Sequence, residues 1–132
     1  MIVADTNLLV YLYITGDKSS IALRVLEKDP HWVVPPLWQS EFRNVLAGYM
    51  RKGMSLKKAQ QIMGNALNAM KSRQVEPSSN KILELIEKSR CTAYDSEFIA
   101  LAQQIGTVVV TADRQLLNSF PKIAISLEEF VK

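Results

Sequence analysis

Cysteine and histidine are almost absent from this chain of 132 residues, which contains one of each, Cys91 and His31. A single cysteine cannot form an internal disulfide, which fits a reducing compartment, and we expect Cys91 to be a structural thiol. With one histidine in the whole chain, catalysis by a histidine acid or base has little support. If the protein is an enzyme, other side chains must carry its chemistry.

Long apolar runs are also missing. No run approaches the roughly 20 apolar residues that span a bilayer, and the first acid, Asp5, comes too early for a signal peptide with a basic start. We therefore expect a cytoplasmic protein without a membrane segment. The length of 132 residues with 48% apolar residues suits one core, so we predict a single domain over residues 1–132.

Acidic residues are missing from one long stretch of the chain. Between Phe42 and Val75 there is no Asp or Glu and there are seven Lys or Arg residues, so this stretch carries +7 while the whole chain carries +3. Such a segment attracts a phosphate backbone or an acidic protein tail, although a solvated lysine-rich helix surface is the alternative.

Short apolar runs alternate with helical patterns along the chain. The apolar runs predict buried strands at residues 1–4, 32–34, 107–110 and 123–125. Helical spacing predicts helices at about 7–13, 18–28, 37–50, 55–71, 79–89, 96–105 and 114–118. This alternation predicts an α/β fold with a mainly parallel sheet. The apolar stripe of residues 55–71 either packs in the core or accepts a second subunit or a partner helix.

Four carboxylates fall where such a fold gathers its ligands. Asp5 and Asp113 follow predicted strands, and open parallel sheets bind ligands at the carboxyl ends of their strands. Asp95 stands at the predicted start of a helix, and Glu41 lies about one turn into another helix beside apolar neighbours. Each acid alone has an ordinary explanation, as a helix cap for the three aspartates and as an exposed residue for Glu41. Chance agreement of all four is harder to accept, so we predict that they form one cluster.

A cluster of carboxylates needs cations or protons. Two like charges about 4 Å apart repel by roughly 4 kcal/mol at an effective dielectric near 20. One or two Mg²⁺ or Mn²⁺ ions relieve this repulsion and activate water for attack on a phosphodiester, which predicts products with a 5′ phosphate and a 3′ hydroxyl. We predict that Asn7 and Thr111 orient the carboxylates and their waters, although both residue types are also common in turns and at strand ends.

Two other small α/β classes fit the sequence poorly. A phosphoryl-accepting receiver domain needs an acceptor aspartate after a central strand and a lysine after a late strand, and residues 33–35 and 123–126 supply neither. A dinucleotide-binding domain needs a glycine-rich first turn, whereas residues 5–8 contain no glycine.

The blocks around the four acids have a familiar order and spacing. They are residues 2–7, 40–42 with 44–46, 93–96 with 100–102, and 111–113. Together they resemble the PIN domain, and especially the VapC-like toxins of bacterial and archaeal toxin–antitoxin pairs. The resemblance implies a three-layer α/β/α sandwich, an endoribonuclease that depends on Mg²⁺ or Mn²⁺, a homodimer, and a co-encoded VapB-like antitoxin whose tail enters the active-site groove.

Site residues follow from this resemblance position by position. It implies that the acids Asp5, Glu41, Asp95 and Asp113 bind metal and are catalytic, with Asn7 and Thr111 as polar supports. Glu97 would point about 200° away from Asp95 on a helix, so we expect it at the surface. The basic stretch becomes a candidate for holding the RNA backbone, through Arg43, Arg51, Lys52, Lys57 and Lys58. The alternative is a non-catalytic module of the same fold that binds RNA or protein, against which the four intact acids argue.

Overall fold

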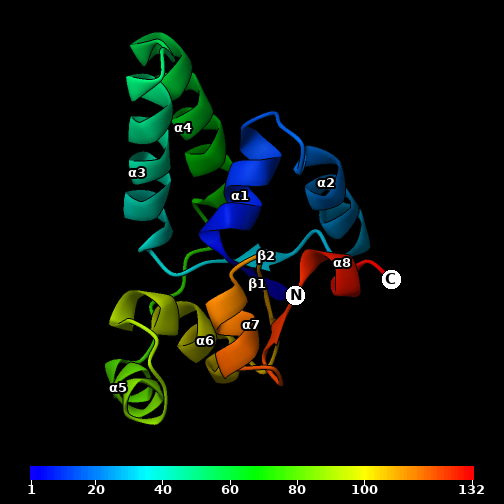
Figure 1. The fold of residues 1–132 in the computed structure, drawn as a ribbon, viewed down its shortest axis with the longest axis vertical. Coiled ribbons are helices and arrows are strands. Elements are labelled where there is room, and N and C mark those ends of the chain that lie inside the picture. The colour runs from blue at the N-terminus through cyan, green and yellow to red at the C-terminus, as the bar shows by residue number, and fades with distance from the viewer.

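The structure, a computed structural model, describes all 132 residues as short strands alternating with helices (Figure 1). The strands are β1 (Ile2–Ala4), β2 (Trp32–Val33), β3 (Val109–Val110) and β4 (Ala124–Ile125). The longer helices are α1 (Thr6–Tyr13), α2 (Ser19–Lys28), α3 (Trp38–Arg51), α4 (Leu56–Met70), α5 (Ser79–Lys88) and α6 (Ala93–Ile105). Two short helices follow, α7 (Arg114–Ser119) and α8 (Leu127–Phe130).

The four strands form one parallel sheet in the order β2-β1-β3-β4. Val3 of β1 lies opposite Val33 on one side and Val109 on the other. The chain builds from β1 to β2 in one direction and then crosses to β3 and β4 on the far side of β1. The edge between the carboxyl ends of β1 and β3 is therefore the point where the order reverses, which is the usual ligand site of such sheets.

Helices cover both faces of the sheet. Ile2 and Ala4 pack in a core with α1, α2, α3, α4 and α8, whereas Val3 between them packs in a second core with α5, α6 and α7. This follows from the alternation of side chains along a strand, and it explains why β1 is apolar at every position. Figure 1 shows the two helical layers above and below the sheet. The predicted α/β/α sandwich with a parallel sheet is confirmed.

Local hydrogen bonds fix two helix starts that the sequence analysis did not predict. Helix α6 begins at Ala93 instead of residue 96, because the Thr92 hydroxyl accepts the Asp95 N–H at 3.0 Å and caps the helix. Asp95 therefore lies in the first turn of α6 and is not its cap. Helix α8, which the apolar pattern did not predict, begins where the Ser126 hydroxyl accepts the Glu129 N–H.

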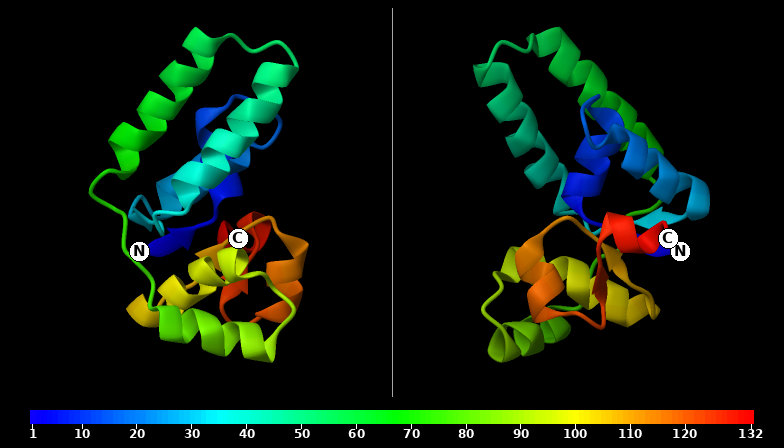
Figure 2. Two further views of the ribbon diagram at one scale, coloured as in Figure 1. Left: turned by 90° about the vertical axis from the view of Figure 1, so that its left-hand side faces the viewer. Right: turned by 45° about the vertical axis from the view of Figure 1, so that its right-hand side comes forward.

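Helices α3 and α4 form a hairpin that extends from the body of the molecule in both views of Figure 2. Gly53 makes the turn with a φ of 114°, a conformation that side-chain-bearing residues rarely adopt. Ala59, Ile62 and Ala66 of α4 are buried, which confirms core packing for the centre of its apolar stripe. Leu56 and Leu67 at the margin remain 61% and 37% exposed.

Gly106 ends α6 in the left-handed conformation, with a φ of 73°. We expect Gly106→Ala to lower the free energy of unfolding by about 1 kcal/mol, because alanine adopts this conformation at a cost. Gly64→Ala in the exposed middle of α4 is the matched control, since nothing lies within 4 Å of the added methyl group. It should raise stability by roughly 0.5–1 kcal/mol. Chemical denaturation of both variants measures the difference, and equal shifts would contradict the assignment.

Candidate active site

A cavity of about 200 Å³ lies beyond the carboxyl ends of β1 and β3. We call it the acid cavity, and it is lined by Asp5, Thr6, Asn7, Glu41, Asn44, Val45, Asp95 and Asp113. The four predicted acids come from four places in the chain: the end of β1, the first turn of α3, the first turn of α6 and the loop after β3. The structure thus brings together residues up to 108 positions apart in the sequence.

Asp5 is the most buried of the four, at 8% exposed. One carboxylate oxygen accepts the Thr6 N–H at 2.8 Å and so caps α1, and the other accepts the Thr111 hydroxyl. The Thr111 hydroxyl in turn accepts the Asp113 N–H at 2.9 Å. Thr111 therefore joins the two strand-end acids through hydrogen bonds.

Glu41 reaches the cavity from the other side, on α3. The Thr6 hydroxyl donates to its Oε1 at 2.6 Å and the Thr6 N–H donates to Asp5, so this one residue contacts two of the four acids. No role for Thr6 was predicted from the sequence. The feature of the sequence that could have indicated a role is its place, as a polar residue directly after the buried strand and Asp5. In the structure Thr6 is only 5% exposed.

Asp113 has both a structural contact and a free oxygen. Its Oδ1 accepts the N–H groups of Gln115 and Leu116 at 2.8 and 3.3 Å and caps α7, whereas Oδ2 has no protein donor. The ordinary explanation of Asp113, a helix cap, is therefore confirmed, and its role at a metal stays a prediction. One oxygen fixes the side chain and the other faces no competing partner.

Burial and the charges of neighbouring acids raise the pKa values of Asp5, Glu41 and Asp95. Burial raises the pKa of Asp5 from 3.8 to about 6, with further upward contributions from the charges of Glu41 and Asp113, against the lowering effect of its hydrogen bonds. Burial also raises the pKa of Glu41, and the charges of Asp95, Glu97 and Asp113 add to it. The pKa of Asp95 is raised by burial and then by Asp113. The site is therefore a strained, electronegative centre that a cation would relieve.

The donor set suits a hard divalent cation. All four side chains offer carboxylate oxygens, the ligands that Mg²⁺ and Mn²⁺ prefer. No three acidic, histidine or cysteine side chains anywhere in the structure converge closely enough to hold one ion by themselves. Such an ion would have one or two direct carboxylate ligands and complete its shell with water, as Mg²⁺ commonly does.

Two other predicted positions, Asn7 and Glu97, and one unpredicted position, Asn44, lie in or near the acid cavity. Asn7 lines the cavity, but its exposed amide makes no protein hydrogen bond. Glu97 was expected at the surface and is instead partly buried, where its charge raises the pKa of Glu41. Asn44, which sequence reasoning left without a role, lines the cavity one turn after Glu41. Its signal was the spacing of three residues, which puts both side chains on one helix face.

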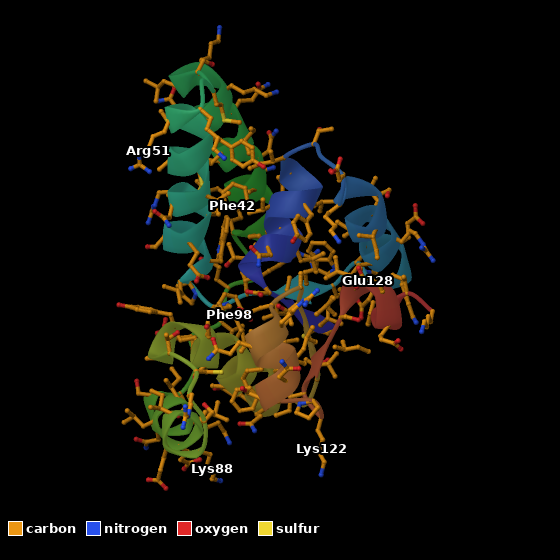
Figure 3. All side chains as sticks on the ribbon, viewed as in Figure 1. Phe42, Arg51, Lys88, Phe98, Lys122 and Glu128 are labelled. Carbon is orange, nitrogen blue, oxygen red and sulfur yellow. The ribbon has the colours of Figure 1, made fainter.

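The five candidate RNA-binding cations are exposed and form no ion pair, but they divide into two groups. Arg43 lies two residues after Glu41 and donates to the Ser40 hydroxyl at 3.2 Å. Arg51 is ten residues beyond Glu41, about 15 Å along α3, and points away from the body of the molecule (Figure 3). Lys52, Lys57 and Lys58 lie with Arg51 at the turn of the α3–α4 hairpin.

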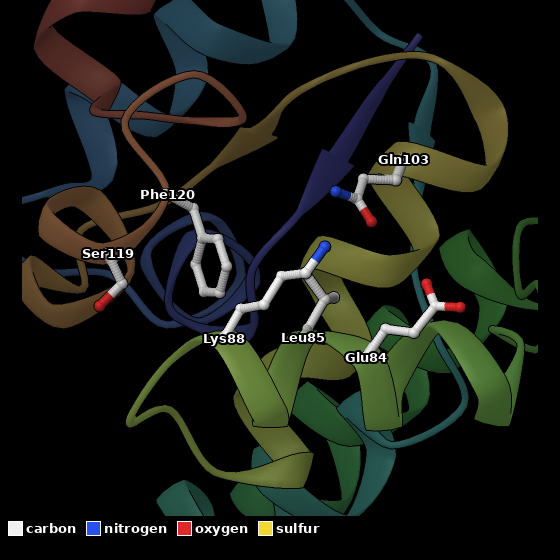
Figure 4. A pocket seen from close by; sticks show the side chains of 6 residues that line it. All are labelled: Glu84, Leu85, Lys88, Gln103, Ser119 and Phe120. Atoms are coloured by element: carbon white, nitrogen blue, oxygen red, sulfur yellow. The ribbon is translucent and has the colours of Figure 1, made fainter.

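A second cavity, of about 310 Å³, lies in the opposite helical layer between α5, α6 and the end of α7 (Figure 4). Leu85 and Phe120 form its apolar part, with Lys88 and Glu84 among its polar residues. It contains a single carboxylate and none of the four acids. The acid cavity therefore remains the better candidate for chemistry on a phosphodiester.

No helix of the structure is long and apolar enough to span a membrane.

Comparison with known proteins identifies a matching family model, a relative and two similar folds. The family model described as PIN domain matches residues 2–124. Ribonuclease VapC3 of Pyrobaculum aerophilum is 26% identical over 126 residues, which cover 92% of this chain and 96% of that protein. The crystal structure of PAE2754 from Pyrobaculum aerophilum has a TM-score of 0.76 and 22% identity, covering 98% of this chain and 92% of that one. The crystal structure of FitAcB from Neisseria gonorrhoeae has a TM-score of 0.75 and 16% identity, with 97% and 99% covered.

Proposed function

Because the chain belongs to the PIN domain family, as its sequence blocks predicted, we propose that it is a divalent-metal-dependent endoribonuclease acting at the acid cavity. The observation that carries the proposal is the meeting of four carboxylates from four separate elements around one cavity at the reversal point of the sheet. The similarity to Ribonuclease VapC3 over nearly the whole chain supports RNA as the substrate. One catalytic domain covers residues 1–132.

Each side chain has a defined part in this proposal. Asp5, Glu41, Asp95 and Asp113 would hold one or two Mg²⁺ or Mn²⁺ ions, directly or through water, and a bound ion would supply positive charge at the scissile phosphate and lower the pKa of a bound water. Thr111 fixes Asp5 and the backbone of Asp113, while Thr6 fixes Glu41, so the ligands need little rearrangement when RNA arrives. Hydrolysis leaves a 5′ phosphate and a 3′ hydroxyl.

The test is cleavage of total cellular RNA by the purified chain, freed of any bound partner. We expect cutting with Mg²⁺ or Mn²⁺ and none with EDTA, and fragments that a ligase requiring 5′ phosphates accepts without further treatment. Intact RNA in the presence of metal, or fragments ending in 2′,3′ cyclic phosphate, would overturn the mechanism. Intact RNA that is nevertheless bound would favour the alternative, a non-catalytic module of the same fold.

The proposal extends to the cellular role. The resemblance to VapC-like toxins supports a cytoplasmic toxin that forms a homodimer and is inhibited by a VapB-like antitoxin. The exposed apolar margin of α4, with Leu56 and Leu67, offers a surface for a second subunit or a partner helix. If a small DNA-binding protein is encoded beside this chain, its co-expression should abolish RNA cleavage, and the two proteins should elute together in gel filtration.

The basic turn of the α3–α4 hairpin should bind RNA remote from the cut. We expect the double variant Lys57→Glu/Lys58→Glu to weaken RNA binding and to lower the slope of log K against log salt by about 1 to 1.5, since each phosphate contact to a single strand contributes about 0.7. Reversal of two exposed lysines in the other helical layer, Lys88→Glu/Lys122→Glu, is the control (Figure 3). Filter binding at several salt concentrations measures both variants. Equal slopes would show that the turn of the hairpin does not contact the RNA.

A further inference from the structure

A larger hollow of about 590 Å³ opens directly beside the acid cavity. It lies between the beginnings of α3 and α6, and it shares Glu41, Asn44 and Asp95 with the acid cavity. Its remaining walls are four residues that no part of the proposed chemistry uses. We call this hollow the side groove, defined by Leu37, Ser40, Asn44, Thr92 and Tyr94.

Tyr94 is the feature that distinguishes the side groove. Its side chain is 63% exposed, among the most exposed of the large hydrophobic residues, and its hydroxyl makes no protein hydrogen bond. A single exposed aromatic residue needs no explanation by itself. Here, however, the ring borders a hollow that leads to Glu41 and Asp95, and the partly buried Leu37 adds an apolar surface.

The side groove favours an uncharged group over a phosphate. Its acidic side chains are Glu41 and Asp95, whose negative charges oppose a phosphate unless bound cations neutralise them. A nucleobase is neutral, flat and rich in hydrogen-bonding edges. The exposed amide of Asn44, which has no protein partner, supplies a donor and an acceptor for such an edge. Arg43 contacts Ser40 on the groove wall and offers a cation for the backbone attached to that base.

We propose that the side groove holds the base of a nucleotide adjoining the cleaved phosphate, stacked on Tyr94 and hydrogen-bonded by Asn44. This inference rests on the proposed function, because it assigns to the same site a positioning element for its RNA substrate. Bases of single-stranded RNA are commonly bound by stacking on aromatic rings, whereas bases within a duplex have no free face to offer. The groove therefore selects unpaired positions and aligns the backbone over the acids.

The binding experiment uses a fluorescein-labelled RNA octamer of mixed sequence, in EDTA so that metal-dependent cleavage cannot occur. We expect Tyr94→Ala to weaken binding measured by anisotropy from about fivefold to a hundredfold, the range for loss of one base–aromatic stack. Tyr94→Phe keeps the ring and should retain the wild-type affinity. Tyr49→Ala removes an exposed tyrosine that lies on α3, outside the groove, and should also leave the affinity unchanged.

The kinetic experiment separates positioning from damage to the site. With Mn²⁺ present, Tyr94→Ala should raise KM for the octamer while the Mn²⁺-induced increase in Tm stays at its wild-type value. Wild-type affinity of Tyr94→Ala, or an equal loss in Tyr94→Phe, would overturn the side-groove proposal while leaving the nuclease proposal intact. If the wild-type chain cleaves no RNA, the nuclease proposal fails, and this inference fails with it.

Discussion

Replacement of Asp5 by asparagine should abolish RNA cleavage, with a loss of at least about a hundredfold in kcat/KM. Asparagine keeps the size of the side chain and an oxygen that accepts the Thr6 N–H, but it removes the charge that would hold a divalent cation. Loss of a residue that merely supports a ligand costs about 10- to 100-fold at metal sites, and loss of a ligand costs no less. The measurement is the initial rate of cleavage in Mg²⁺ and in Mn²⁺, across a range of metal concentrations.

The matched control for this variant is Glu84→Gln, which neutralises a carboxylate in the second cavity (Figure 4). It should cleave RNA at the wild-type rate. If Asp5→Asn keeps its activity while remaining dependent on metal, the ions lie elsewhere and the acid cavity is not the centre of catalysis. If both variants lose activity equally, the losses report a general change in charge or stability.

The fold was predictable because its strongest signals are local. The uninterrupted apolar run before Asp5 predicted a strand covered on both faces. In the structure, Ile2 and Ala4 pack in one core and Val3 packs in the other. Helix periodicity located all six longer helices to within a few residues. Helix α8 escaped because it has only four residues and depends on the cap supplied by Ser126.

The position of the acids at one sheet edge was also predictable, since parallel strands end on the same side. What could not be predicted were the contacts made across the cavity. Thr6 donates to a glutamate 35 residues away, and nothing in the local sequence identifies that partner. Glu97 was expected at the surface because helix geometry fixes its direction relative to Asp95. That geometry does not give the position of α3, where the charge of Glu97 raises the pKa of Glu41.

The side groove illustrates the same limit. Tyr94 and Asn44 both belong to the sequence blocks that suggested the family, yet each alone is an ordinary exposed polar or aromatic residue. They line one groove because α3 and α6 begin next to each other, beyond opposite faces of the sheet. Distance along one helix is easier to predict, and the 15 Å that separates Glu41 from Arg51 follows from about 1.5 Å per residue.

The metal-free protein should lose stability as the pH rises from about 4 to about 6. Asp5 has a folded-state pKa of about 6, above its ordinary value of 3.8, so in this range the folded state retains a proton that the unfolded chain has released. Stability then falls with rising pH, by up to about 3 kcal/mol for Asp5, and stays constant above the window. The raised pKa values of Glu41 and Asp95 act in the same direction.

Asp5→Asn isolates this contribution because it cannot titrate. Relative to the wild type in EDTA, its free energy of unfolding should increase by up to about 3 kcal/mol between pH 4 and pH 7, whatever constant offset the lost Thr111 contact introduces. Urea denaturation at several pH values measures the difference. Mn²⁺ should reverse the trend for the wild type alone, since metal competes with protons for Asp5 and stabilises the folded state more at higher pH. If the difference in free energy of unfolding between the two proteins does not change with pH, the pKa of Asp5 is not raised by folding. The electrostatic reason for a cation at this site would then disappear.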